Sequence, residues 1–119
     1  MADHPHDPQL LKGVLSLLLL ALLAQRESYG YEIVRRLHAT GLDGVLEGTV
    51  YPALSRLERE GCLTTRLVAS TSGPARKYYR PTAAGYAALA AGTASWMTLA
   101  EIVNSELSQP IPDEPSKGA

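Results

Sequence analysis

The chain of 119 residues contains a single cysteine, Cys62, and begins with no recognisable signal peptide. One cysteine excludes an intrachain disulfide, and a secretory signal would show a charged start, an apolar segment and a small-residue cleavage site. Both observations fit a reducing compartment, so we expect a cytoplasmic protein. We interpret Cys62 as a buried structural thiol, with a redox switch as the alternative.

The chain also lacks the motifs that carry common enzyme chemistry. It has no nucleophile elbow, no glycine-rich phosphate loop and no CxxC pair. Its histidines, His4, His6 and His38, do not form a metal-ligand set, because two of them fall in a short polar segment at the N-terminus. We therefore predict no catalytic residues, no metal and no cofactor.

A hydrophobic run long enough to cross a membrane is absent as well. The apolar stretch of residues 14–24 has eleven residues between Lys12 and Arg26, whereas a membrane-spanning helix needs about 20. We interpret it as a helix buried on most of its circumference. A chain of this length makes a modest core, so we expect a partner subunit to cover part of this helix, and we expect no membrane contact.

An overall excess of positive charge is missing too, since the formal net charge is −1. The distribution is uneven, however. Residues 26–80 carry nine Lys and Arg against six acids, a balance of +3, whereas residues 81–119 carry one Lys against four acids, a balance of −3. Only the middle of the chain is therefore suited to contacts with phosphates.

The hydrophobic pattern predicts four helices and one hairpin. We expect helices over residues 9–25, 28–40, 47–61 and 82–107, with Ser28 and Thr82 as N-caps and Gly41 and Gly61 as stops. Two stretches rich in β-branched and aromatic residues, 63–68 and 76–81, flank a polar turn and predict a β-hairpin.

This order of elements predicts a mainly α fold with a small β-hairpin, a winged helix-turn-helix followed by a long C-terminal helix. We divide the chain into a disordered N-terminal tail, a DNA-binding domain, a C-terminal dimerisation helix and a disordered C-terminal tail, at residues 1–8, 9–81, 82–107 and 108–119.

The third predicted helix is the most informative segment. Its apolar positions, Val50, Ala53, Leu54 and Leu57, recur at helical spacing and must face a core. The opposite face is short, rich in hydrogen-bond donors and net basic, and it carries Thr49, Ser55, Arg56 and Arg59. Such a face is suited to a DNA groove, although a merely solvated helix face has the same pattern.

Five separate motifs resemble those of the PadR family of bacterial transcriptional regulators. They are YGYEI at 29–33, EGTVYPAL at 47–54, RLE at 56–58, Gly61 and RKYYRPT at 76–82. The resemblance covers residues 10–107 and implies a winged-helix regulator of the smaller subfamily, which dimerises through the helix after the wing. It also implies inverted-repeat operators with half-sites like ATGT and ACAT. Leu46 departs from the pattern, because family members usually have a capping serine there.

These motifs and their chemistry give the candidate DNA contacts. Hydroxyl, phenol and guanidinium groups can bind phosphates or base edges. Arg56 can hold a phosphate or a guanine edge, or else only pair with Glu60 four residues on. We interpret Arg35 and Arg36 as solvated, and expect one of Tyr78 and Tyr79 to face the core. The candidate DNA-binding residues are Tyr29, Gly30, Thr49, Tyr51, Pro52, Ser55, Arg56, Arg76 and Lys77.

The last predicted helix carries a near-heptad apolar stripe, which is typical of helix-to-helix packing. We expect Leu89, Trp96, Leu99, Val103 and Leu107 to form the dimer interface. The resemblance implies a further role for Trp96, since some multidrug-sensing members stack flat ligands on a tryptophan there. The candidate effector-binding residues are Leu15, Leu18, Trp96 and Met97; Trp96 as a plain interface anchor is the alternative.

Together these features predict a homodimeric transcriptional repressor that binds double-stranded DNA and is released by a small hydrophobic or aromatic effector. The alternative is a winged-helix protein-interaction module without an effector site or without DNA binding.

Overall fold

The computed structural model describes residues 7–113. It contains four helices and a three-stranded antiparallel sheet of strand order β1-β3-β2. In chain order the elements are α1 (Pro8–Gln25), β1 (Ser28–Tyr29), α2 (Gly30–Ala39), α3 (Glu47–Arg59), β2 (Leu63–Ser70), β3 (Gly73–Pro81) and α4 (Ala83–Leu107). The predicted winged helix-turn-helix with a long last helix is confirmed.

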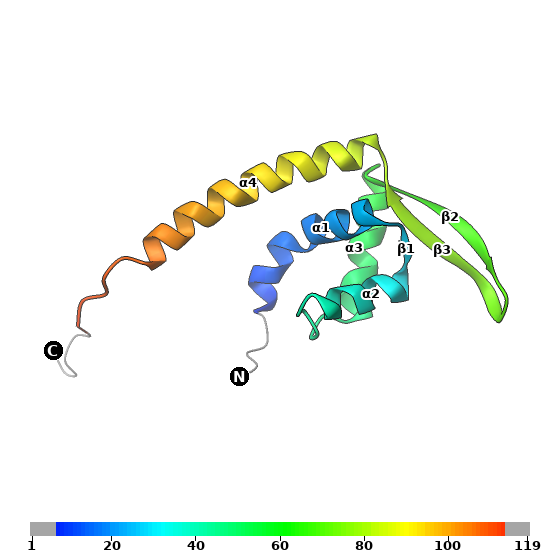
Figure 1. The fold of residues 1–119 in the computed structure, drawn as a ribbon, viewed down its shortest axis with the longest axis horizontal. Coiled ribbons are helices and arrows are strands. Elements are labelled where there is room, and N and C mark those ends of the chain that lie inside the picture. The colour runs from blue at the N-terminus through cyan, green and yellow to red at the C-terminus, as the bar shows by residue number, and fades with distance from the viewer. Residues whose placement is uncertain (1–6, 114–119) are drawn as a thin grey trace.

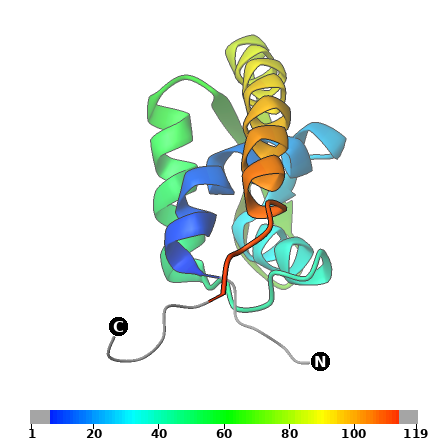
Figure 2. The same ribbon diagram turned by 90° about the vertical axis from the view of Figure 1, so that its left-hand side faces the viewer.

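The molecule is elongated, with extents of 67 × 30 × 21 Å. The β2–β3 hairpin projects from one end of the helical body, and the C-terminal part of α4 projects from the other (Figure 1). Seen end-on, α1 lies between α3 and α2, with α4 to one side of it (Figure 2). The hairpin and α4 are therefore the two parts of the chain that the body supports least.

The leucine-rich helix α1 forms the centre of the core. Every residue from 14 to 24 is buried or half-buried, which confirms the predicted buried helix. With 18 residues, α1 has the length and composition of a membrane-crossing helix, but five of its leucines pack in the core instead: Leu15, Leu19, Leu20, Leu22 and Leu23. These side chains meet the buried apolar faces of α2 and α3.

The hairpin is longer than the sequence predicts. Pairing continues to Ser70 opposite Gly73, so only Thr71 and Ser72 are left between the strands, and the register is irregular between Val68 and Ser70. The polar segment was wrongly predicted as a seven-residue turn. Its backbone groups are paired across the ladder, which polar side chains do not prevent on an exposed ribbon.

Helix ends follow local signals in most places. Thr82 is the predicted N-cap of α4: its hydroxyl accepts from the Gly85 amide at 3.0 Å and donates to the Gly61 carbonyl at 2.6 Å. Gly41 and Gly61 have φ values of 111° and 81°, which favour glycine after a helix. Of the predicted tails, residues 1–6 and 114–119 lie outside the described residues, whereas Asp7 caps α1, which begins at Pro8.

The start of α4 is fixed against the turn between α3 and β2. The amide of Thr82 donates to the Cys62 carbonyl at 3.0 Å. A Cβ on Gly85 would lie 2.0 Å from that same carbonyl oxygen, so this approach requires glycine. Cys62 is half-buried and packs against the core, so it is less buried than the structural thiol that we predicted.

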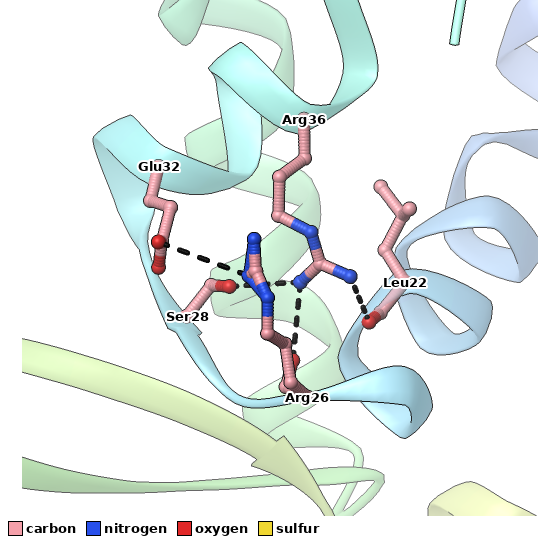
Figure 3. Close-up of polar contacts among 5 residues, drawn as sticks. All are labelled: Leu22, Arg26, Ser28, Glu32 and Arg36. Carbon is pink, nitrogen blue, oxygen red and sulfur yellow. Dashed lines mark hydrogen bonds and ion pairs between the residues drawn. The ribbon is translucent and has the colours of Figure 1, made fainter. Parts of the chain in front are cut away.

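Arg36 of α2 joins α1, β1 and α2 (Figure 3). Its Nη2 donates to the Leu22 carbonyl at 2.7 Å, and its Nη1 donates to the Ser28 hydroxyl at 2.8 Å and to the Arg26 carbonyl at 3.1 Å. The guanidinium thus binds carbonyl groups at the end of α1, of which the Leu22 carbonyl also accepts from the Arg26 amide at 3.3 Å. Burial and the nearby positive charge of Arg26 lower the pKa of Arg36, but an arginine stays charged.

Two expectations are therefore wrong. Ser28 does not cap α2, because it is fully buried in strand β1 and its hydroxyl accepts from Arg36; the N-cap is Tyr29, which makes no side-chain capping bond. Arg36 is not solvated, because the C-terminal end of α1 offers it acceptors within reach.

Replacing Arg36 by alanine leaves a buried hydroxyl and two helix-end carbonyls without this donor. We expect the free energy of unfolding in urea to fall by about 1–3 kcal/mol. Arg35→Ala is the matched control, since Arg35 is the exposed neighbour on the same helix, and we expect a change below about 0.5 kcal/mol. Equal losses in the two variants would contradict the role of Arg36.

Candidate nucleic-acid interface

Helix α3 presents the predicted polar face to solvent. Val50, Ala53, Leu54 and Leu57 are buried in the core. The other side of the helix is exposed, and it carries Thr49, Tyr51, Pro52, Ser55, Arg56 and Arg59. The helix continues through Pro52, and its N-cap, Leu46, makes no side-chain hydrogen bond. A missing cap costs about 1 kcal/mol and leaves first-turn amides open at the exposed end of the helix.

A hollow of about 280 Å³ lies between the start of α2, the first turns of α3 and the middle of β3. It brings together five of the predicted DNA-binding residues from four elements, Tyr29, Gly30, Tyr51, Arg76 and Lys77. Tyr31 and Tyr79 complete the lining; they belong to the same motifs but were not predicted as site residues. The other four predicted contacts, Thr49, Pro52, Ser55 and Arg56, lie on α3 outside this hollow.

Aromatic rings hold the two cations in the middle of β3. The guanidinium carbon of Arg76 lies 4.4 Å from the ring centre of Tyr29, and Lys77 Nζ lies 5.4 Å from that of Tyr79. Tyr29 and Tyr78 meet edge to face at 5.4 Å. Tyr79 packs against the core, whereas Tyr78 pairs with Tyr29, which confirms that the two neighbours face opposite sides. Such contacts restrict where the charged groups point.

Two cations of the hairpin, Lys77 and Arg66, have carboxylate partners within the chain. Lys77 Nζ lies 3.2 Å from Glu58 of α3, and this hydrogen bond raises the pKa of the lysine. Arg66 of β2 pairs with Glu27, whose pKa it lowers. All of these side chains are at least partly exposed, so each pair contributes little and can exchange its carboxylate for a phosphate at small cost.

Arg56 makes the predicted surface pair and one further contact, with α1. Its Nε lies 3.9 Å from Glu60, the predicted surface pair, and its Nη2 donates to the Ser16 hydroxyl of α1 at 2.6 Å. The side chain is still half exposed. It is therefore held on the outer side of α3 and remains accessible to a ligand.

The candidate residues of α4 occupy two environments. Leu89 packs against the core, whereas Trp96, Leu99, Val103 and Leu107 are exposed, together with Met97. Tyr86 and Ile102 are exposed apolar residues that the predicted stripe left out. Of the other candidate effector residues, Leu15 is buried in the core and Leu18 is half-buried. Within one chain, α4 has a single buried residue, Gly85.

Comparison with known proteins identifies the fold and its family. The model of the transcriptional regulator PadR-like family matches residues 19–91. A PadR-like regulator from Bacillus cereus is 39% identical, with a TM-score of 0.78 over 86% of this chain and 99% of that one. A PadR family regulator from Eggerthella lenta is 33% identical, with a TM-score of 0.77 over 86% and 88% of the two chains.

A curated relative, an uncharacterised protein from Lysinibacillus sphaericus, is 29% identical over 80% of this chain and 89% of its own length. The match of the family model covers α2, α3 and the hairpin, where the candidate DNA contacts lie. The chain therefore belongs to the PadR-like family and is a DNA-binding transcriptional regulator rather than an enzyme.

Proposed function

We propose that two copies of this chain pair through α4 and act in the cytoplasm as a repressor that reads an inverted repeat in double-stranded DNA. The observation that carries this proposal is the surface of α4. A helix of 25 residues with one buried residue gains little packing from its own chain, whereas helices in water depend on tertiary packing of an apolar face.

The exposed apolar side chains of α4 gather in its projecting half, and they include Trp96, Met97, Leu99, Ile102, Val103 and Leu107. Nearer its start, α4 crosses α1 closely, since a Cβ on Gly92 would lie 2.8 Å from Leu17 Cδ1. The first half of the helix is thus occupied by its own chain, and the second half offers the apolar surface. An exposed apolar row of this kind is typical of a protein interface.

In such a dimer, each subunit presents α3 and a hairpin to DNA. The exposed face of α3 enters the major groove with its N-terminal end first, where Thr49, Ser55 and Arg56 reach base edges or phosphates. Arg76 and Lys77 at the hairpin contact the backbone or the minor groove, which sets affinity rather than sequence choice. Two-fold symmetry requires half-sites about one helical turn apart.

The exposure of Trp96 and Met97 supports a second part of the proposal, which is that a small hydrophobic or aromatic effector releases the protein from DNA. Paired α4 helices would enclose these side chains between the subunits, and we expect the half-buried Leu18 to complete the lining. Leu15 is buried in the core, so it is not open to an effector within one chain. An effector that changes the spacing of the two α3 helices acts through a coupling of about 1–3 kcal/mol.

DNA binding is tested by fluorescence anisotropy on a duplex with ATGT and ACAT half-sites and on a scrambled duplex. We expect Arg56→Ala to weaken binding and reduce the difference between the two duplexes. Lys77→Ala removes one phosphate contact, so it should weaken both equally and lower the slope of log affinity against log salt by about one. Lys12→Ala on α1 is the control. A wild-type protein without sequence preference would favour the protein-interaction module.

The α4 interface is tested by sedimentation equilibrium of Leu99→Glu and Val103→Glu. A charge in an apolar interface is costly to bury, so we expect both variants to sediment as monomers and to lose most of their DNA affinity. Ile111→Glu is the matched control, because Ile111 is an exposed apolar residue beyond the end of α4. A dimeric Leu99→Glu protein would contradict the proposed interface.

Effector binding is tested through Trp96, the only tryptophan. Flat aromatic compounds should quench its fluorescence with saturation and should weaken DNA binding of the same sample. Trp96→Ala should lose this release, measured at protein concentrations at which sedimentation shows the variant to be dimeric. A Trp96→Ala protein that still leaves DNA on addition of the compound would contradict an effector site at this residue.

A further inference from the structure

The ring of Tyr51, in the second turn of α3, lies against the first residue of α2, Gly30. A Cβ built on Gly30 would lie 2.8 Å from Tyr51 Cε1, 3.1 Å from Cζ and 3.2 Å from the hydroxyl oxygen. Real Cβ atoms essentially never approach another atom within 3.0 Å. The phenol of Tyr51 therefore occupies the space that any side chain at position 30 would need.

The backbone of Gly30 gives no other reason for a glycine. Among the described residues, the glycines with positive φ are Gly41 and Gly61, so Gly30 has a conformation that any residue can adopt. It is also the first residue of a helix, where alanine is the better helix former. The absence of a side chain at position 30 makes room for the Tyr51 ring, whereas the backbone conformation there does not require a glycine.

Tyr51 also lines the hollow between α2, α3 and β3, whose lining includes the cations Arg76 and Lys77. Burial and, to a smaller extent, the Glu47 carboxylate raise the pKa of the Tyr51 phenol. A phenol with a raised pKa stays protonated near neutral pH, so it remains a hydrogen-bond donor. A phenol donor in a hollow that two cations also line is suited to an anionic oxygen.

We infer that Gly30 is a positioning residue for DNA recognition. Because it has no side chain, the Tyr51 ring can lie against the start of α2, where its hydroxyl donates to a backbone phosphate oxygen of DNA. The inference rests on the proposed DNA binding by this face. It assigns Gly30 an indirect role, in contrast to the direct phosphate contact that the sequence suggests.

A phosphate is favoured over a base because of where the hollow lies. Its lining comes from the start of α2, the first turns of α3 and β3, beside the exposed side of α3 that carries Ser55 and Arg56. Phosphate contacts carry no sequence information. Loss of the Tyr51 contact should therefore weaken specific and scrambled duplexes by the same factor.

A double-mutant cycle tests the role of Gly30, with Gly30→Ala, Tyr51→Ala and the double variant compared by anisotropy on the two duplexes. We expect each single variant to bind about tenfold more weakly, as for the loss of one hydrogen bond to a charged group. Once the ring is absent, an alanine at position 30 has room. The double variant should therefore bind within about twofold of Tyr51→Ala.

Two further variants sharpen the cycle. Tyr51→Phe keeps the ring and removes the donor, so it should lose as much affinity as Tyr51→Ala. Gly13→Ala is the matched control, since Gly13 is also a helical glycine and a Cβ there meets nothing within 4 Å; it should bind like the wild type. A further loss of several fold from Gly30→Ala in the Tyr51→Ala background, or a Tyr51→Phe protein with full affinity, would overturn the inference.

The contact itself is tested without DNA, by NMR of tyrosine labelled with ¹³C at Cζ and assigned with Tyr51→Phe. In Gly30→Ala the displaced ring should be more solvated, so the Tyr51 pKa should fall toward the ordinary value for tyrosine. An unchanged Tyr51 resonance and pKa would overturn the contact. If this shift appears but the wild-type protein binds neither duplex, the proposed DNA binding fails while the contact stands.

Discussion

The packing of α1 determines where everything else in this protein lies. Its five buried leucines meet the apolar faces of both α2 and α3, so the angle between those helices depends on this one surface. Arg36 adds a polar link, since it binds the carbonyl of Leu22 near the end of α1 and the buried hydroxyl of Ser28. Apolar burial supplies most of the stability, and the guanidinium adds hydrogen bonds to carbonyls at the end of α1 and to the buried Ser28 hydroxyl.

One consequence of such a compact core is that two elements extend beyond it. The hairpin leaves the body at one end with Arg76 and Lys77, and α4 leaves it at the other with an apolar surface (Figure 1). The side chains of each projecting element are suited to a different kind of partner. Cations held over tyrosine rings are suited to phosphates, whereas exposed leucine, valine and tryptophan side chains are suited to another apolar helix.

The side that we propose to face DNA is less positive than its arginines and lysines suggest. Lys77, Arg66 and Arg56 are each close to a carboxylate of the same chain. Binding to DNA would exchange these carboxylates for phosphates, so the gain per cation is smaller than for an unpaired charge. The uneven distribution of charge, +3 over residues 26–80 and −3 over residues 81–119, lets a chain with a formal net charge of −1 keep an excess of cations in its winged-helix part.

The sequence by itself determined the helices, the hairpin, the Thr82 cap and the polar face of α3, because helical periodicity, caps and glycine stops are local signals. Only the tertiary structure decided the roles of Ser28, Arg36 and Gly30. Strand β1 has two residues and no periodicity, and it exists because β3 lies beside it. Gly30 is a glycine because a ring twenty-one positions later in the chain needs its space. Contacts between distant segments depend on how the core brings them together, and no local pattern encodes that.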